Sequence, residues 1–311
     1  MPPELANIAD SISLSPNQAI GIPIALFGAI LISIGTQLQH TGVARVGSDA
    51  DTKAGLSLRQ ILALIAQPLW VFGTLMMGLA ILFQLTSLAF APLIVVQPLG
   101  AIALVVTAIV NSRQSGVKLD RLSIRAIAFC VGGVGLFVTI AALTAKSSPI
   151  TELQLRIVLI ILTVVLVVFG VLFALFRKHF TPLFYVVGAG VLFGFVVTLA
   201  KVVIDRVKTL SFAGFQLAPE DWLTVLCIVG LAVAGLLGSY FVQSAYSNGP
   251  PDLVVAGLTV IDPLVAIAIG IIVLGEAAHA PLWAILAFVV AGALAIYGVF
   301  QLAKHHPQTQ H

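Results

Sequence analysis

The stretch Gln97–Ala103 reads QPLGAIA and recurs 165 residues later as Asp262–Ala268, which reads DPLVAIA. Five of the seven residues are identical. A second pair follows in the same order, with AFCVGG at Ala128–Gly133 and AFVVAG at Ala287–Gly292. One such match can arise by chance in an apolar chain, but two in the same order are harder to explain in that way. They predict an internal repeat.

Apolar residues dominate the whole chain of 311 residues. They make up 60% of it, only 9% of the residues are charged, and the mean hydropathy is +1.14. A soluble globular domain carries about 25% charged residues, so this chain has too few polar groups to coat a water-soluble core. The composition excludes a water-soluble enzyme, a nucleic-acid-binding protein and a secreted disulfide scaffold. We expect the chain to lie in a lipid bilayer.

Nine apolar runs have the roughly 20 residues that a helix needs to cross the hydrocarbon layer. The runs are continuous, which favours helices over the alternating strands of a membrane barrel. We therefore expect an all-α, polytopic membrane protein of about nine transmembrane helices, with residues 1–311 as a single membrane domain. The stretch Leu56–Gln67 is either a short interfacial helix or a tenth crossing. The expected spans are residues 18–41, 62–88, 92–110, 123–143, 154–176, 181–203, 222–246, 252–274 and 281–303.

The fifteen Lys and Arg residues decide the expected orientation. If the N-terminus is outside, ten of them lie on the cytoplasmic side, with the densest group in residues 113–125. The positive-inside rule then predicts a multi-pass protein of the cell membrane with its C-terminus in the cytoplasm. Spans three and eight, which carry the repeated stretch, would cross in opposite directions. The expected inverted repeats are residues 18–143, with four spans, and residues 154–303, with five.

Inverted repeats are typical of secondary transporters, which bind their substrate near the middle of the bilayer. We therefore expect a transporter that works by alternating access, and neither an enzyme nor a protein with a bound cofactor. Its partners would be a small solute or ion and the lipid bilayer, without nucleic acid. The sequence leaves open whether the protein is a monomer or a homodimer.

The end of the second span resembles a known family. Residues Ala89–Pro92 read AFAP and are followed by PLGA at Pro98–Ala101. Together with the nine spans, this pattern is similar to the NIPA-like magnesium transporters of the drug/metabolite transporter superfamily, which has duplicated, EamA-like spans. Where that pattern carries an acidic residue and an asparagine ahead of AFAP, this chain has Ile81 and Gln84. The resemblance implies transport of Mg²⁺.

Asp262 is the carboxylate that lies deepest in a predicted span. Ionisable groups at such depth are costly and usually functional. Pro263 lacks an N–H, so the carbonyl of Thr259 loses its usual helical donor, and Thr259 shares a helix face with Asp262. This face offers three oxygen ligands to a metal ion or a coupling proton. A structural hydrogen bond between helices would explain Asp262 as well.

Gln97 is the repeat partner of Asp262, and it also precedes a proline, Pro98. Two facing repeats would place Gln97 and Asp262 on opposite walls of one cavity. Pro98 and Pro263 are expected at breaks or bends of their helices. Gln84, deep in the second span, is a further candidate for substrate binding. For both glutamines an interhelical hydrogen bond is the alternative.

Two more candidates lie nearer to the ends of spans. Gln37 lies toward the inner end of the first span, where it could line the mouth of a cavity. Lys201 and Asp205 are one helical turn apart in the sixth span, which predicts a local ion pair with the lysine directed outward. The alternatives for Lys201 are binding of an anion or substrate, or contact with Asp262.

The predicted cargo is a small cation, with Mg²⁺ as one candidate, or a small polar metabolite. A flippase for a lipid-linked head group is an alternative, because the same superfamily fold supports it. A cation channel is a second alternative, although it would need a continuous polar path and few polar residues line any one predicted helix. The sequence does not identify the coupling ion or the direction of transport.

Overall fold

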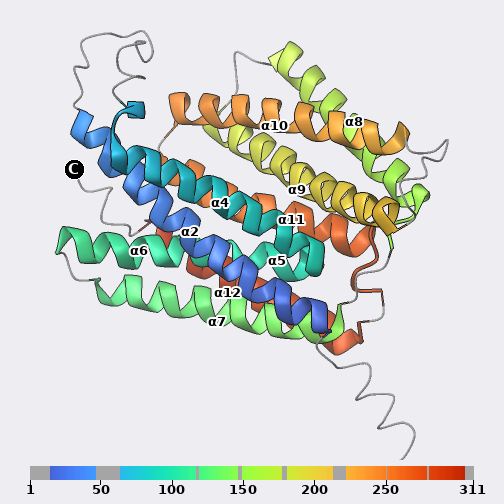
Figure 1. The fold of residues 1–311 in the computed structure, drawn as a ribbon, viewed down its shortest axis with the longest axis horizontal. Coiled ribbons are helices and arrows are strands. Elements are labelled where there is room, and N and C mark those ends of the chain that lie inside the picture. Colours follow the sequence, from blue (N-terminus) through green and yellow to red (C-terminus); the bar gives the residue numbers. More distant parts are fainter. Residues whose placement is uncertain are drawn as a thin grey trace, which may run out of the picture.

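The computed structural model describes residues 15–46, 64–116, 119–145, 149–176, 181–212, 222–249, 251–278 and 280–304, and the regular structure in these ranges is helical (Figure 1). Most of the helices lie side by side along the long axis of the molecule. They are α2 (Pro16–Val46), α4 (Pro68–Phe90), α5 (Leu93–Leu99), α6 (Ala101–Ser115), α7 (Arg121–Thr144), α8 (Glu152–Phe176), α9 (Pro182–Phe212), α10 (Trp222–Asn248), α11 (Pro251–Ile272) and α12 (Leu282–Lys304).

Nine segments within these ranges are long and apolar enough to cross a bilayer, with α5 and α6 together forming the third. The predicted all-α, multi-pass architecture is therefore confirmed. The second span begins at Pro68 rather than at residue 62, because proline fits the first helical turn, where no N–H donor is needed. The stretch Leu56–Gln67 lies mostly outside the described residues, and its described part, residues 64–67, adds no span.

The helices pack mainly in pairs. α2 lies along α4, α7 lies along α12, and α9 packs against both α10 and α11. α5 contacts α7 and α11 in the middle of the bundle, and its residues Leu93–Val96 are completely buried. α8 lies at the edge beside α10, and most of its apolar surface is exposed (Figure 1). A helix that is apolar and exposed suits contact with lipid.

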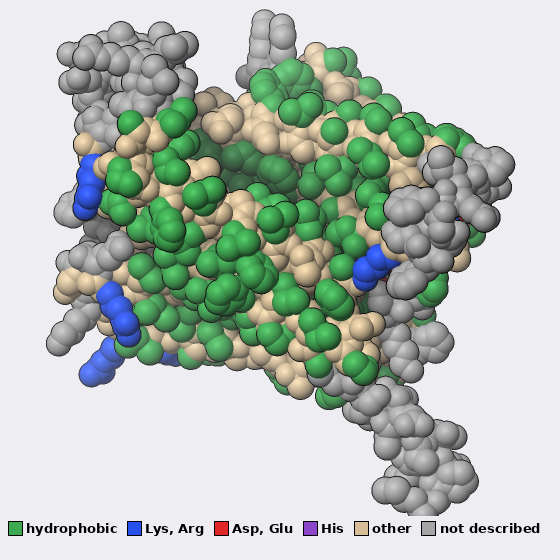
Figure 2. Space-filling model, viewed as in Figure 1, with side chains coloured by type: hydrophobic (Ala, Val, Ile, Leu, Met, Phe, Trp, Pro, Cys, Tyr) green, Lys and Arg blue, Asp and Glu red, His purple; other side chains and the backbone are tan. Residues whose placement is uncertain are grey.

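The surface has the pattern that a bilayer requires. The face in Figure 2 is covered by apolar side chains over its middle, while Lys and Arg side chains lie toward its two ends. On α8, Ile160 and Val167 expose 62% and 58% of their surface. So large a continuous apolar surface would be unfavourable in water. The chain is a multi-pass membrane protein.

α9 and α11 approach each other closely because α9 has glycine at two positions one turn apart. A Cβ atom on Gly190 would lie 2.7 Å from the Cβ of Ile261, and one on Gly194 would lie 3.1 Å from the carbonyl oxygen of Asp262. Small residues allow such close packing between membrane helices. The contact holds the middle of α11, including Asp262, against α9.

Two glutamines each stabilise the start of a helix and also bind a backbone carbonyl that is distant in sequence. Gln154 Oε1 accepts from the amide of Thr151 (2.8 Å) at the start of α8, and Gln18 makes the matching contact with Ser15 (3.2 Å) before α2. Such reciprocal contacts satisfy amides that have no helical partner. The Nε2 of Gln154 also donates to the carbonyl of Val273 (3.1 Å), and that of Gln18 donates to the carbonyl of Ala145 (2.9 Å).

The third and eighth spans differ near their prolines. In the third, α5 ends at Leu99 and α6 begins at Ala101, so the division lies just after Pro98. In the eighth, α11 continues as one helix past Pro263. Membrane helices tolerate an internal proline where neighbouring helices supply other partners. A bend of α11 at Pro263 stays a prediction.

Candidate transport site

A cavity of about 410 Å³ lies in the middle of the bundle, between α2, α4, α5, α6, α9 and α11. Four of the residues selected from the sequence line it: Gln84 from α4, Gln97 from α5, and Thr259 and Asp262 from α11. Pro263 lines it as well. The rest of the lining is apolar or glycine, so these few polar groups are the ones that a solute in the cavity would meet among the described residues.

Two polar atoms in this lining are buried without a partner. The Oδ1 of Asp262 and the Nε2 of Gln97 have no hydrogen bond to any described residue. Gln97 exposes only 5% of its surface. Most buried polar atoms in proteins are hydrogen-bonded, and an unpartnered one needs an explanation such as water, an ion or a ligand. A solute bound between α5 and α11 would satisfy both atoms.

Thr259 adds oxygen acceptors beside Asp262. Its hydroxyl donates to the carbonyl of Val255 (2.7 Å), which leaves the lone pairs of the hydroxyl oxygen available. Its carbonyl lacks the usual helical donor, because residue 263 is proline. The wall formed by α11 therefore offers one carboxylate and two neutral oxygens.

This set of ligands suits a cation that keeps part of its water shell. Among the described residues no group of three or more His, Cys, Asp or Glu side chains could hold a metal ion. Mg²⁺ gives up its water reluctantly and is often bound through one or two carboxylates together with several waters. Six waters occupy about 180 Å³ in the liquid. The cavity of about 410 Å³ therefore has room for a hydrated divalent cation.

Gln37 and Lys201 lie outside this cavity lining. Gln37 is buried on α2, beyond Ile32, and its role at a mouth of the cavity stays a prediction. The expectation that Lys201 would be directed outward is wrong, because its side chain is buried and its Nζ donates to the carbonyl of Leu88 (2.8 Å). The expected ion pair with Asp205 is present, at 3.0 Å.

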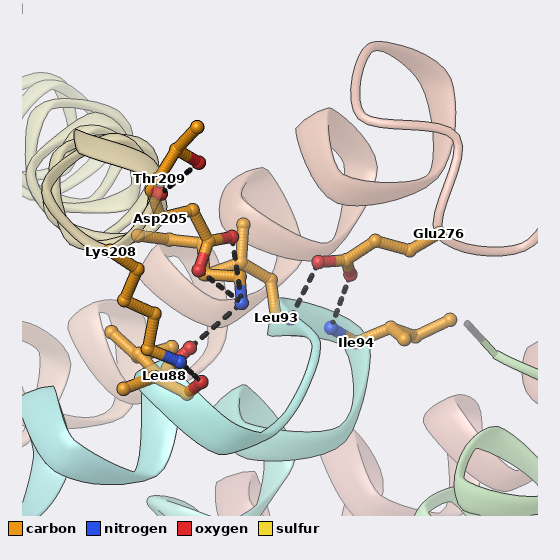
Figure 3. A network of polar contacts seen from close by, with 9 residues as sticks. Leu88, Leu93, Ile94, Asp205, Lys208, Thr209 and Glu276 are labelled. Atoms are coloured by element: carbon orange, nitrogen blue, oxygen red, sulfur yellow. Dashed lines mark hydrogen bonds and ion pairs between the residues drawn. The ribbon is translucent and has the colours of Figure 1, made fainter. Parts of the chain in front are cut away.

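The structure adds a buried acidic residue that sequence reasoning missed. Glu276 follows α11, exposes 4% of its surface, and accepts hydrogen bonds from the amides of Leu93 (2.8 Å) and Ile94 (2.9 Å) at the start of α5 (Figure 3). Gly275 has a φ of +71°, which turns the chain so that Glu276 can reach α5. Burial raises the pKa of the Glu276 carboxyl, while the amide hydrogen bonds from Ile94 and Leu93 act in the opposite direction.

Sequence reasoning placed Glu276 in a loop, because the predicted spans ended at residue 274 and resumed at residue 281. A weak signal was present. The chain has only 12 acidic residues, and this one follows an apolar run directly after a glycine. Its partners in α5 are more than 180 residues away in sequence, which no local pattern indicates.

Comparison with known proteins gives a family match and a relative that each cover most of the chain. A family model described as magnesium transporter NIPA matches residues 16–307. The chain is also 25% identical over 287 residues to an uncharacterized protein of Corynebacterium glutamicum, covering 92% of this chain and 95% of that protein. No solved structure gives a significant match.

Two named transporters match over shorter stretches. The chain is 27% identical over 134 residues to the magnesium transporter NIPA4 of Mus musculus, covering 43% of this chain and 32% of that protein. It is 29% identical over 120 residues to the probable magnesium transporter NIPA4 of Arabidopsis thaliana, covering 39% and 34%. These matches span about a third of each named transporter.

Proposed function

The chain belongs to the NIPA magnesium transporter family, and from this premise we propose that it carries Mg²⁺ across the membrane through the cavity that contains Asp262. The cation binds with part of its water shell. Asp262 neutralises part of its charge, while Gln97, Gln84 and Thr259 hold its waters or supply a neutral oxygen. Without Mg²⁺, a proton on Asp262 could take its place, which would couple transport to a proton gradient.

The observation that carries this proposal is the unpartnered carboxylate oxygen of Asp262 in the cavity. A structural carboxylate between helices would be expected to use both of its oxygens in hydrogen bonds. A single carboxylate also suits a transporter, because the site must release its cation as well as bind it.

We infer that transport proceeds by alternating access between two inverted repeats. Residues 18–143 would form the first half, with α2, α4, α5–α6 and α7. The second half, residues 154–303, would contain α9, α10, α11 and α12 in the same order, with α8 in addition. The packing of α2 on α4 parallels that of α9 on α10, and α5 contacts α11, its counterpart, beside the cavity. Rocking of one half against the other would expose Asp262 to each side in turn.

The orientation proposed here has the N-terminus outside the cell membrane and the C-terminus in the cytoplasm. It rests on the positive charges near the ends of the spans, above all those in residues 113–125. Magnesium would then enter the cavity from either side according to the direction of the gradient.

A lipid-linked head group is the second candidate substrate, and one observation favours it. Ile81 and Leu85 of α4 line the cavity, and they also expose 56% and 37% of their surface. The cavity therefore approaches the outer face of the bundle at α4, where the tail of a lipid could extend into the bilayer while its head group occupied the cavity.

The experiment that separates these candidates is thermal unfolding of the purified protein with Mg²⁺, Ca²⁺, Na⁺ or a lipid-linked sugar. A ligand of the folded state stabilises it by about 2.7 kcal/mol at a concentration of 100 times its Kd. We expect stabilisation by Mg²⁺ that is lost in Asp262→Asn and kept in Glu152→Gln, which alters an exposed carboxylate. Equal stabilisation of Asp262→Asn would contradict the proposed site, and stabilisation only by the lipid-linked sugar would favour the second candidate.

A further inference from the structure

Four charged side chains surround residues 88–94, which comprise the end of α4 and the start of α5 and are called the α4–α5 turn below. Lys201, Asp205 and Lys208 come from α9, and Glu276 follows α11. Figure 3 labels the last three of these residues. Their formal charges cancel. We refer to these four residues as the clasp.

The clasp binds backbone groups of the turn from two sides. Lys201 donates to the carbonyl of Leu88 (2.8 Å), and Lys208 donates to the carbonyl of Ala89. Glu276 accepts from two amides at the start of α5, as described above. The ion pair of Asp205 with Lys201 fixes the position of the lysine. These hydrogen bonds involve charged groups, which makes them stronger than those between neutral groups.

The clasp adjoins the candidate transport site. Leu88, whose carbonyl binds Lys201, lines the central cavity, and so does Ala200, the residue before Lys201. Lys201 and Glu276 expose only 2% and 4% of their surface. Buried charged groups of this kind are costly inside a membrane protein unless a role retains them. The clasp therefore borders the cavity where α4 and α9 meet.

We propose that the clasp is a gate, which opens when the α4–α5 turn separates from α9 and from Glu276. The proposal rests on alternating access as inferred above. The turn belongs to the first proposed half of the chain, whereas all four clasp residues belong to the second. Movement of the halves away from each other at this end must break the contacts of Lys201, Lys208 and Glu276 with the turn. Formation of the same contacts closes the cavity again.

The test measures access to the cavity without any substrate. In a protein whose Cys130 and Cys227 are replaced by alanine, Ala29→Cys places a single thiol on the cavity lining. A second protein carries Thr151→Cys instead, which places an exposed thiol at the same end of the molecule as the clasp. Thr151 lies at this end because Gln154, one turn further on, donates to the carbonyls of Val273 and Leu274, close to Glu276 in sequence. A membrane-impermeant thiol reagent is added to one side of sealed vesicles. The side that labels Thr151→Cys is the clasp side.

We expect Lys201→Met and Glu276→Gln to raise the labelling rate of Ala29→Cys from the clasp side by about tenfold or more, the order expected when a hydrogen bond to a charged group is lost. Glu152→Gln, which removes an exposed ion pair at the same end, should leave the rate unchanged. Gly270→Ala provides a variant with every charge intact, because its Cβ would lie 2.8 Å from the Oε2 of Glu276 and displace that carboxylate. It should also raise the rate.

An unchanged rate in Gly270→Ala and in the folded charge variants would overturn the gate, and so would an equal increase from both sides, since that indicates general loosening. The result is independent of the cargo. If the clasp variants label faster but the purified protein does not bind Mg²⁺, the gate is upheld and magnesium is rejected as the substrate. If the purified protein binds Mg²⁺ but the clasp variants label at an unchanged rate, the gate alone is rejected.

Discussion

The buried Oδ1 of Asp262 and the buried Nε2 of Gln97 line the same cavity from two helices, and neither atom is hydrogen-bonded to a described residue. One is an acceptor and the other is a donor. A cation bound at Asp262 would favour rotation of the Gln97 amide, so that its oxygen rather than its nitrogen approached the ion. The two residues can therefore act on one bound cation, with Asp262 as its anionic ligand and the Gln97 oxygen as a neutral one.

Replacement of Gln97 separates binding from stability. We expect Gln97→Met to weaken Mg²⁺ binding by roughly tenfold, because it removes a neutral ligand or a partner for bound water. The folded protein should keep its thermal stability, since the variant also removes an unpartnered buried polar atom. Titration of Mg²⁺ against the thermal midpoint measures both effects.

Gln154→Met is the matched control for Gln97. This side chain donates to the carbonyls of Val273 and Leu274, both at 3.1 Å, and does not line the cavity. It should lower stability by about 1 kcal/mol and leave Mg²⁺ affinity unchanged. The reverse pattern, with Gln97→Met unstable and able to bind Mg²⁺ normally, would assign Gln97 to structure.

A larger residue at Gly194 should separate α9 from α11. A Cβ there would lie 2.7 Å from the Cβ of Val265 and 3.1 Å from the carbonyl oxygen of Asp262. We expect Gly194→Val to destabilise the protein by about 1–3 kcal/mol, as overpacking commonly does. Gly135→Val is the control, because the space around Gly135 is open. Thermal midpoints in detergent that were equal for the two variants would argue against this helix contact.

The turn that directs Glu276 toward α5 depends on the backbone of Gly275. Its φ of +71° is unfavourable for residues with a Cβ, and asparagine tolerates it better than alanine. We expect Gly275→Ala to lower stability by about 1 kcal/mol or more, and Gly275→Asn to lower it less. Thermal unfolding of both variants measures the order. A more stable alanine variant would show that this turn does not constrain Glu276.

The parts of the structure that depend on local pattern could be predicted from the sequence. The apolar runs indicated nine spans, and Asp262, Thr259, Gln97 and Gln84 were selected from depth, helical spacing and the repeat. The direction of Lys201 could not be predicted, because its acceptor on Leu88 is 113 residues away. Glu276 was missed for the same reason. A charged residue at the end of a span normally extends into water, and only the folded bundle supplies its buried backbone partners.

The orientation of the chain can be tested with a reporter that fluoresces only in the cytoplasm. We expect a fusion after His311 to be fluorescent and one before Met1 to be dark, because the proposed orientation has the C-terminus inside. A dark C-terminal fusion of normal abundance would reverse the orientation or add a crossing, for which Leu56–Gln67 is the candidate stretch.

Magnesium flux through Asp262→Asn tests the central proposal most directly. The substitution keeps the shape of the side chain and removes its charge, so a purely structural hydrogen bond could largely survive it. In proteoliposomes loaded with a magnesium-sensitive dye, we expect wild type and Glu152→Gln to admit Mg²⁺ down its gradient. Asp262→Asn, folded and reconstituted in equal amount, should reduce the flux to the level of empty vesicles. A wild-type rate of Mg²⁺ entry through Asp262→Asn would contradict the assignment of this cavity as the transport site.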